Sequence, residues 1–224
     1  MTTHPRLHQV EAGGNVYLCI DDDGLTLLDC GMPRNAPKIL AAVTALGYAP
    51  ADVKRILITH ADIDHVGSLA ALQQATGAAV FAGAATRDLL VAGKQPQHLP
   101  WLAHALSSLF FRVKPLPGST ISVVAPGDRL PVLDEVEVLA TPGHTLDHLS
   151  FFSPSTGILL AGDALNARRG KLQCSPNNIS ADRPAVRRSA RLLLERQPAF
   201  FACGHGPLLT PEEAGAAALL AGLD

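Results

Sequence analysis

Short apolar runs separated by polar turns fill the first half of the chain. Val16–Ile20 and Leu25–Asp29 have the length and apolar content of β-strands, and the Asp-Gly pair at positions 23 and 24 between them is typical of a tight hairpin. These two strands are therefore expected to pair antiparallel. The same pattern predicts strands at Arg55–Ile58 and Ala79–Ala82, and helical spacing predicts helices at Ala36–Leu46, Gly67–Ala75 and Ala84–Val91.

The second half returns to strands after a segment of different character. Between Gln95 and Gly118, prolines bracket an apolar stretch at residues 101–111, which predicts an inserted helix between loops. A helix from Pro184 to Arg196 and a last helix beginning at Pro211 are expected, because each proline stands at a helix start. The strands predicted here are Ile121–Val124, Val136–Ala140, Leu149–Ser153, Ile158–Ala161 and Phe200–Ala202.

Strands, then helices, then strands and helices again predict an α/β fold. We expect an αββα sandwich, with two mixed β-sheets packed face to face and helices outside, although the pattern alone also accommodates a doubly wound sheet. The 224 residues have a 47% hydrophobic content and no evident linker. One domain over 1–224, with the apolar insert at about 95–118, is the expected organisation.

Charge and cysteine usage narrow the classes of function. A formal net charge of −2 provides no strong field for nucleic acid, and the only basic cluster fits the wet face of one helix. Four scattered cysteines without a C-x-x-C pair favour reduced thiols, and the polar N-terminus lacks the apolar core of a signal peptide. No run is long enough to span a membrane. A cytoplasmic protein that binds neither nucleic acid nor membrane is expected.

Four side chains that can bind metal are crowded directly after the strand predicted at Arg55–Ile58. They are His60, Asp62, Asp64 and His65. Imidazole and carboxylate suit zinc, iron or manganese, and open sheets place their chemistry beyond strand ends. The alternative is a solvated loop in which Asp64 caps the next helix, but a cap requires neither histidine. The cluster therefore predicts a metal centre.

Three further strand ends carry such residues among glycines, which let the backbone turn sharply. These segments contain His144, Asp163 and His205, in Thr141-Pro142-Gly143-His144, Ala161-Gly162-Asp163-Ala164 and Cys203-Gly204-His205-Gly206. Cys203 fits a small buried strand residue better than a thiolate ligand. His148, four residues after His144, is interpreted as a structural histidine near the site. His4, His8, His98 and His104 are assigned no role.

The ordered set of four segments resembles the metallo-β-lactamase superfamily, and the resemblance runs from about Val16 to His205. Members carry a His-x-His-x-Asp-His motif, a later His, a bridging Asp and a final His, and bind two metal ions in an αββα sandwich. The resemblance implies that His60, Asp62 and His144 hold the first ion, that Asp64, His65 and His205 hold the second, and that Asp163 bridges them. Asp29, at a strand end, matches a position that supports the first loop.

Asp62 departs from the family motif, since it stands where a histidine is usual. A carboxylate makes the first site harder, which moves preference from zinc toward iron or manganese while zinc remains the first expectation. Alternatively, Asp62 points to solvent and leaves the first site empty.

The resemblance implies a hydrolase whose hydroxide, held between two divalent ions, cleaves an ester, lactone or thioester of a small molecule, with Asp64 passing a proton to the leaving group. An iron-dependent persulfide dioxygenase of the same fold and a non-catalytic metal-binding domain are the alternatives. A glutathione thioester is not expected, because the chain ends soon after Pro211. A β-lactam substrate stays an alternative, although β-lactam hydrolysis ordinarily belongs to an exported protein and no export signal is visible.

The apolar insert predicts a substrate with an apolar portion. Its large side chains are Trp101, Leu102, Leu106, Leu109, Phe110 and Phe111. They are expected to cover the sandwich and, in part, to line a pocket or a subunit contact, so a homodimer stays open.

Overall fold

A computed structural model describes residues 2–98 and 111–223, which form two compact units. The N-terminal unit is built mainly from His4–Pro96 and also contains residues up to Val124. The C-terminal unit is built mainly from Ala125–Asp224 and also contains Gln97 and His98. Each unit has its own sheet, helices and buried core, and the expectation of one domain over 1–224 stays a prediction.

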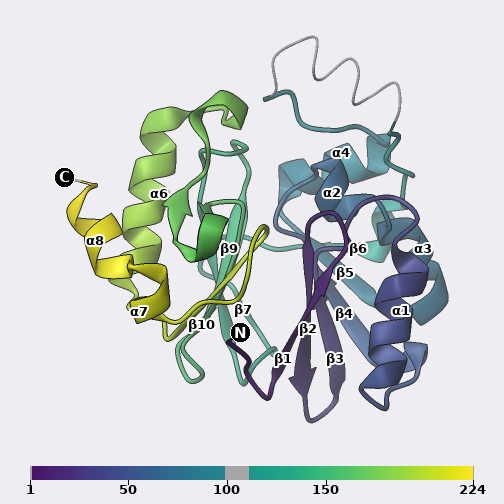
Figure 1. Cartoon of the computed structure of the whole chain (residues 1–224). Helices are drawn as coiled ribbons and strands as arrows, with labels where there is room; N and C mark the ends of the chain where they lie inside the picture. Colours follow the sequence, from purple (N-terminus) through teal and green to yellow (C-terminus); the bar gives the residue numbers. More distant parts are fainter. Residues whose placement is uncertain (1, 99–110, 224) are drawn as a thin grey trace. The chain divides into compact units, whose positions relative to one another are not determined.

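A six-stranded mixed sheet forms the centre of the N-terminal unit, in the order β1-β2-β3-β4-β5-β6 (Figure 1). Its strands are β1 Leu7–Glu11, β2 Asn15–Asp21, β3 Gly24–Leu28, β4 Val53–Leu57, β5 Ala79–Ala82 and β6 Ile121–Val123. The first three strands pair antiparallel, with Asp21 opposite Gly24 at the predicted hairpin. From β3 to β6 every pairing is parallel, so β3 and β4 both end at the edge where the metal-capable loop begins.

Helices connect the parallel strands of this unit. They are α1 Ala36–Ala45, α2 Ile63–Val66, α3 Leu69–Thr76 and α4 Ala84–Ala92, with 3₁₀ turns at Pro50–Asp52 and Gly118–Thr120. α1 and α3 run beside each other against the sheet (Figure 1). Ile39 and Val43 of α1 and Leu72 of α3 are fully buried in the apolar cluster under these helices. This apolar burial holds the sheet edge that carries the loop.

The C-terminal unit contains a five-stranded sheet in the order β13-β10-β9-β8-β7 and a separate pair, β11-β12. The strands are β7 Arg129–Leu130, β8 Val136–Ala140, β9 Leu149–Ser153, β10 Ile158–Gly162, β11 Leu165–Asn166, β12 Gln173–Cys174 and β13 Phe200–Cys203. Helices α6 Arg183–Glu195, α7 Pro211–Ala214 and α8 Ala216–Ala221 accompany them (Figure 1), with 3₁₀ turns at Arg168–Gly170 and Asn177–Ile179. β10 pairs parallel with β13 and antiparallel with β9.

Most predicted elements are confirmed within a residue or two, and the differences have local causes. The helix expected at Gly67–Ala75 is α3, which begins at Leu69, and the short α2 before it was not predicted. The two helices are separated at Gly67 and Ser68, where the Ser68 hydroxyl donates to the Met32 carbonyl. The last helix divides at Gly215, whose φ of +67° belongs to the left-handed region. The strands β1, β7, β11 and β12 were not predicted, because each is short or carries few apolar residues.

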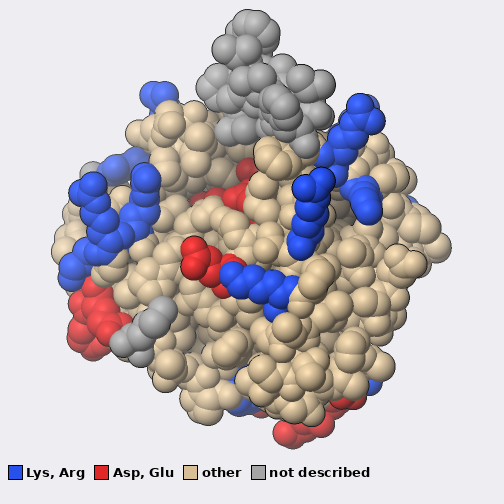
Figure 2. Space-filling model, turned by 45° about the vertical axis from the view of Figure 1, so that its right-hand side comes forward, with Lys and Arg blue, Asp and Glu red and all other residues tan. Residues whose placement is uncertain are grey.

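The basic cluster predicted on one helix face is confirmed on α6. Asp182 caps this helix by accepting from the Ala185 amide, and the buried side includes Ala190 and Leu193. Arg183, Arg187 and Arg188 are exposed on the opposite side. On the face drawn in Figure 2, Lys and Arg side chains stand in separate groups rather than in one continuous field.

Among residues 2–98 and 111–223, no helix is both long and apolar enough to cross a membrane. The helix predicted in the insert lies almost entirely outside the described residues. Of its large apolar side chains only Phe111 is described, and that side chain is exposed.

Candidate metal centre

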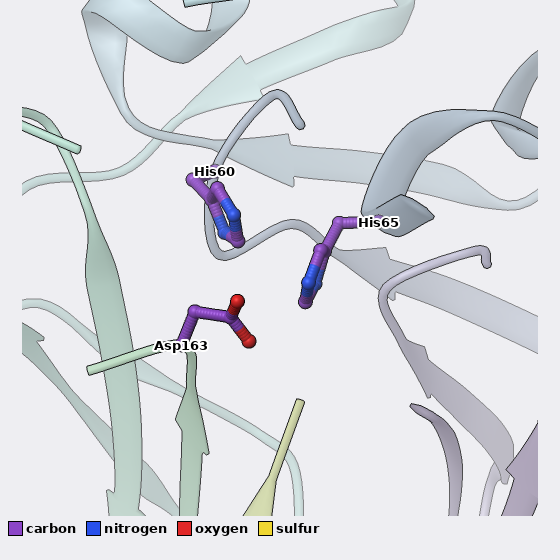
Figure 3. A group of neighbouring side chains, drawn as sticks. All are labelled: His60, His65 and Asp163. Atoms are coloured by element: carbon purple, nitrogen blue, oxygen red, sulfur yellow. The ribbon is translucent and has the colours of Figure 1, made fainter. Parts of the chain in front are cut away.

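The loop after β4 carries the first four candidate ligands and is fixed from within the N-terminal unit. His60 and His65 are completely buried, and their ring centroids lie 4.2 Å apart (Figure 3). Gly14, in the β1–β2 turn, packs so closely that a Cβ there would stand 2.7 Å from the Asp64 carbonyl oxygen. The loop is therefore built around two adjacent imidazoles and has no room to swing away on that side.

Asp29 supports this loop from the end of β3. Its backbone has a φ of +57°, a left-handed conformation that Asp tolerates better than most residues. Oδ1 accepts from the Thr59 amide at 2.9 Å, and Oδ2 accepts from the Thr59 hydroxyl at 2.9 Å and from His65 Nδ1 at 2.8 Å. The sequence placed Asp29 at a supporting position, and these contacts show what it supports.

The same contacts determine which nitrogen of each imidazole carries the hydrogen. The Thr59 hydroxyl donates its only hydrogen to Asp29, so at its 2.9 Å contact with His60 Nδ1 it must accept. A carboxylate can only accept, so His65 Nδ1 donates to Asp29. Both rings therefore carry hydrogen on Nδ1, so Nε2 is the nitrogen left for an ion.

Each Nε2 atom in this loop lies near a carboxylate oxygen. His60 Nε2 is 3.5 Å from Asp62 Oδ2, and His65 Nε2 is 3.9 Å from Asp64 Oδ2. Asp62, not Asp64, occupies the N-cap position of α2, and its side chain makes no cap hydrogen bond. Its side chain is 16% exposed. The geometry therefore fits neither a capping role for Asp64 nor an Asp62 that points to solvent.

In the C-terminal unit, His144, Asp163 and His205 follow the ends of β8, β10 and β13. Figure 3 shows the Asp163 carboxylate projecting from its strand end. His144 Nε2 lies 3.6 Å and His205 Nε2 lies 3.4 Å from Asp163 Oδ2. Both distances are longer than a usual direct hydrogen bond and fit ligand atoms that could share an ion. This unit thus gathers its three predicted residues around one carboxylate.

Local features of the C-terminal unit explain why these residues meet. Gly143 has a φ of +142°, and a Cβ there would stand 2.5 Å from the Val186 amide nitrogen, so only glycine lets the chain before His144 pack against α6. His144 Nδ1 lies 3.0 Å from the Ser175 hydroxyl, which follows β12. His144 therefore has a partner at Nδ1, as His60 and His65 have, and its own Nε2 faces Asp163.

Two residues near this group, Ser175 and His98, had no role in the sequence interpretation, whereas His148 was predicted to be a structural histidine near the site. Ser175 contacts His144, and the His98 ring lies edge-on to the His144 ring with centroids 4.8 Å apart. His148 contacts the Asp163 amide. No motif could have pointed to Ser175 or His98, because they lie 31 and 46 residues from His144. His8 lies within β1, His4 lies before that strand and forms an isolated bridge with Leu7, and His104 is outside the described residues.

The cysteines behave as the sequence predicted. All four are free thiols, and Cys203 is completely buried in β13. Burial raises the pKa of the Cys203 thiol, and burial likewise raises the pKa of the Cys30 thiol. A thiol with a raised pKa is a poor thiolate ligand or nucleophile at neutral pH.

Relatives were identified along most of the chain. The protein YobT of Bacillus subtilis, described as uncharacterized, is 30% identical over 95% of this chain and 90% of its own length. A hydroxyacylglutathione hydrolase of Rhodobacter capsulatus is 34% identical over 62% of this chain, but this chain covers only 43% of that enzyme.

Solved structures show the same fold. The Rm3 metallo-beta-lactamase superposes with a TM-score of 0.69 and 27% identity, covering 89% of this chain and 75% of that one. The predicted fold class is thereby confirmed, and a metal-dependent hydrolase is the general class that these relatives support. The model of the metallo-beta-lactamase superfamily matches residues 10–205, which include every predicted ligand. This chain belongs to the metallo-beta-lactamase superfamily.

Proposed function

We propose that this protein uses two divalent metal ions to hydrolyse an ester, lactone or thioester of a small molecule. The observation that carries the proposal is the set of four Nε2-to-carboxylate distances, from 3.4 to 3.9 Å, two in each unit. Ligand bonds of about 2.0–2.1 Å in a tetrahedral site separate neighbouring ligand atoms by about 3.3–3.4 Å. Three of the four pairs approach that spacing, and the fourth is slightly longer.

In this proposal the ligand assignment is the one that the family resemblance implies. His60, Asp62 and His144 hold one ion, Asp64, His65 and His205 hold the other, and Asp163 contributes to both. Each of these residues offers one imidazole nitrogen or carboxylate oxygen as a ligand. The assignment is supported by the family match across both units and by the Nδ1 contacts that orient His60, His65 and His144.

When bound, such ions lower the pKa of water toward about 7 and polarise a carbonyl. The residues of the chain supply orientation and proton transfer. Asp64 is the candidate proton carrier because its side chain is 28% exposed, more than that of Asp163 at 8%. The Asp62 carboxylate makes the first site harder, so manganese or iron is expected to support activity as well as zinc.

The proposed substrate is a small molecule with an apolar portion. The hydroxyacylglutathione hydrolase relative acts on a thioester, which supports this class of bond but not that particular substrate. The apolar composition of the insert supports the proposal that the substrate has an apolar portion. Up to about 0.8 kcal/mol of binding per buried methylene is expected, so kcat/KM should rise along a series of lactones or thioesters of increasing acyl length. A flat series would remove this part of the proposal.

Metal content and hydrolysis measured together test the main proposal. Protein loaded with zinc, manganese or iron is expected to hold close to two ions per chain and to cleave esters, lactones or thioesters in a panel that includes a β-lactam. His65→Ala and Asp163→Ala should lose metal and at least about 1,000-fold in rate, whereas His8→Ala, an exposed control, should lose neither. If the protein instead holds a single iron ion per chain and consumes oxygen when a persulfide is added, the dioxygenase alternative is favoured.

A further inference from the structure

His148 is buried between β8 and β10 and uses both ring nitrogens. It is 1% exposed. Its Nδ1 lies 2.8 Å from the Thr141 hydroxyl, and its Nε2 accepts from the Asp163 amide at 3.0 Å. Asp163 is thus contacted through its main chain by a ring outside the predicted ligand set.

The directions of the hydrogen bonds around His148 follow from the one that Ser150 makes. The Ser150 hydroxyl donates to the Ala161 carbonyl at 2.9 Å, because a carbonyl can only accept. Ser150 has no second hydrogen, so at the 2.8 Å contact between the two hydroxyls Thr141 donates to Ser150. A 3.5 Å contact from Thr141 to the His148 carbonyl is too long to compete.

The remaining step determines the state of the ring. The Thr141 hydroxyl has used its hydrogen on Ser150, so His148 Nδ1 must donate to Thr141. His148 is then neutral, with its lone pair on Nε2, where the Asp163 amide donates. With the hydrogen on Nε2 instead, two donors would face each other at Asp163, and two acceptors would face each other at Thr141. Such buried mismatches are costly.

This directed chain of hydrogen bonds joins three strands. It runs from the Asp163 amide through His148, Thr141 and Ser150 to the Ala161 carbonyl. It therefore ends in β10, at Ala161, and begins in the turn directly after that strand, at Asp163. The turn at Gly162 is where the strand pairing shifts register. An irregular turn needs an outside acceptor for its amides, and His148 provides one.

We propose that His148 is a positioning residue for Asp163 and no metal ligand. As the neutral tautomer with hydrogen on Nδ1, it holds the Asp163 main chain so that the carboxylate reaches the Nε2 atoms of His144 and His205. This role rests on the proposed function, because it assumes that the Asp163 carboxylate binds metal. Contacts that orient a ligand in this way typically change metal affinity by about 10- to 100-fold.

Two substitutions test the two ring nitrogens of His148 separately. The amide oxygen of His148→Gln can reach the position of Nε2 and still accept from Asp163, whereas the shorter side chain of His148→Asn reaches only the position of Nδ1. Zinc affinity, measured by competition with a chromophoric chelator, is expected to fall about 10- to 100-fold in His148→Asn and less than tenfold in His148→Gln. His8→Asn, an exposed control, should bind zinc as the unaltered protein does.

The tautomer is measured without activity, from imidazole nitrogen–proton correlations in NMR spectra of the metal-free protein. Signals missing from the spectrum of His148→Gln identify the ring, and hydrogen on Nδ1 is expected. Hydrogen on Nε2, or unchanged zinc affinity in a folded His148→Asn, would overturn the assignment. If His148→Asn does not fold, the tautomer and the His148→Gln affinity decide. Absence of zinc binding in the unaltered protein would instead overturn the proposed function.

Discussion

The two units assemble their candidate ligands in different ways. In the N-terminal unit, four candidate ligands lie in one short loop, and its two histidines share a single support, since Asp29 binds His65 directly and holds His60 through Thr59. In the C-terminal unit, His144, Asp163 and His205 come from three strand ends, and Ser175 and His148 support the first two separately. Damage to one support should therefore spread through the N-terminal loop and stay local in the C-terminal unit.

The largest expected effect comes from the loop residue that combines two roles. Asp64→Asn keeps the size and one ligand oxygen of Asp64 but cannot carry a proton. With full metal occupancy, we expect a loss of about 10²- to 10⁴-fold in kcat on substrates with poor leaving groups and a much smaller loss on activated esters. The measurement is the ratio of the two losses at matched metal content.

Equal losses on both substrate classes would remove the proton-transfer role of Asp64. Asp22→Asn, the same chemical change in the exposed β2–β3 turn, is the matched control. It should leave both rates unchanged.

Asp29→Asn tests whether the N-terminal loop depends on one support. Asparagine tolerates the left-handed backbone, but all three groups at Asp29 are donors and an amide has a single acceptor oxygen, so at least one donor would face the NH₂ group. Metal affinity should fall about 10- to 100-fold. The metal-free protein should lose about 1–3 kcal/mol of unfolding free energy, measured by urea denaturation.

A stability loss without any loss of metal affinity would contradict this account of the loop. Asp29 would then support the fold alone, and the His60 and His65 rings would be held by other contacts. Asp22→Asn again provides the baseline for both measurements.

The contrast between the units also explains what the sequence could predict. Adjacent ligands such as His60 and His65 are visible as a motif, and the glycine-flanked strand ends revealed His144, Asp163 and His205. Asp29 was predicted as a support because it ends a strand and matches a family position, and His148 was predicted only as a structural histidine near the site. Ser175 and the tautomer of His148 depend on tertiary contacts between loops, which no local pattern encodes.

The same limit applies to the secondary structure. Long apolar strands such as β2 and β9 were predicted because burial determines their composition. β1 buries only Leu7 and Val10, and β11 and β12 have two residues each, so their pairing partners rather than their own residues determine them.

Asp62→His tests the departure from the family motif and is expected to change the metal preference more than the rate of hydrolysis. Replacing the carboxylate with imidazole softens the first site, so the activity ratio of zinc to manganese should rise by about tenfold in the variant. Apo-protein reconstituted with each metal provides the ratio. If zinc alone supports activity in the unaltered protein, the Asp62 carboxylate does not set the preference.

Ser175→Ala should have the smallest effect, because it removes one neutral hydrogen bond from one imidazole. His144 keeps its backbone, which Gly143 and α6 hold in place, and the network around Asp163 does not include Ser175. A bond of this kind contributes about 0.5–1.5 kcal/mol, so metal affinity should fall about two- to tenfold, less than in Asp29→Asn. Ser122→Ala, at an exposed position of β6, is the control for the lost hydroxyl. If Ser175→Ala weakened metal binding as much as Asp29→Asn, the C-terminal ligands would be as interdependent as those of the loop.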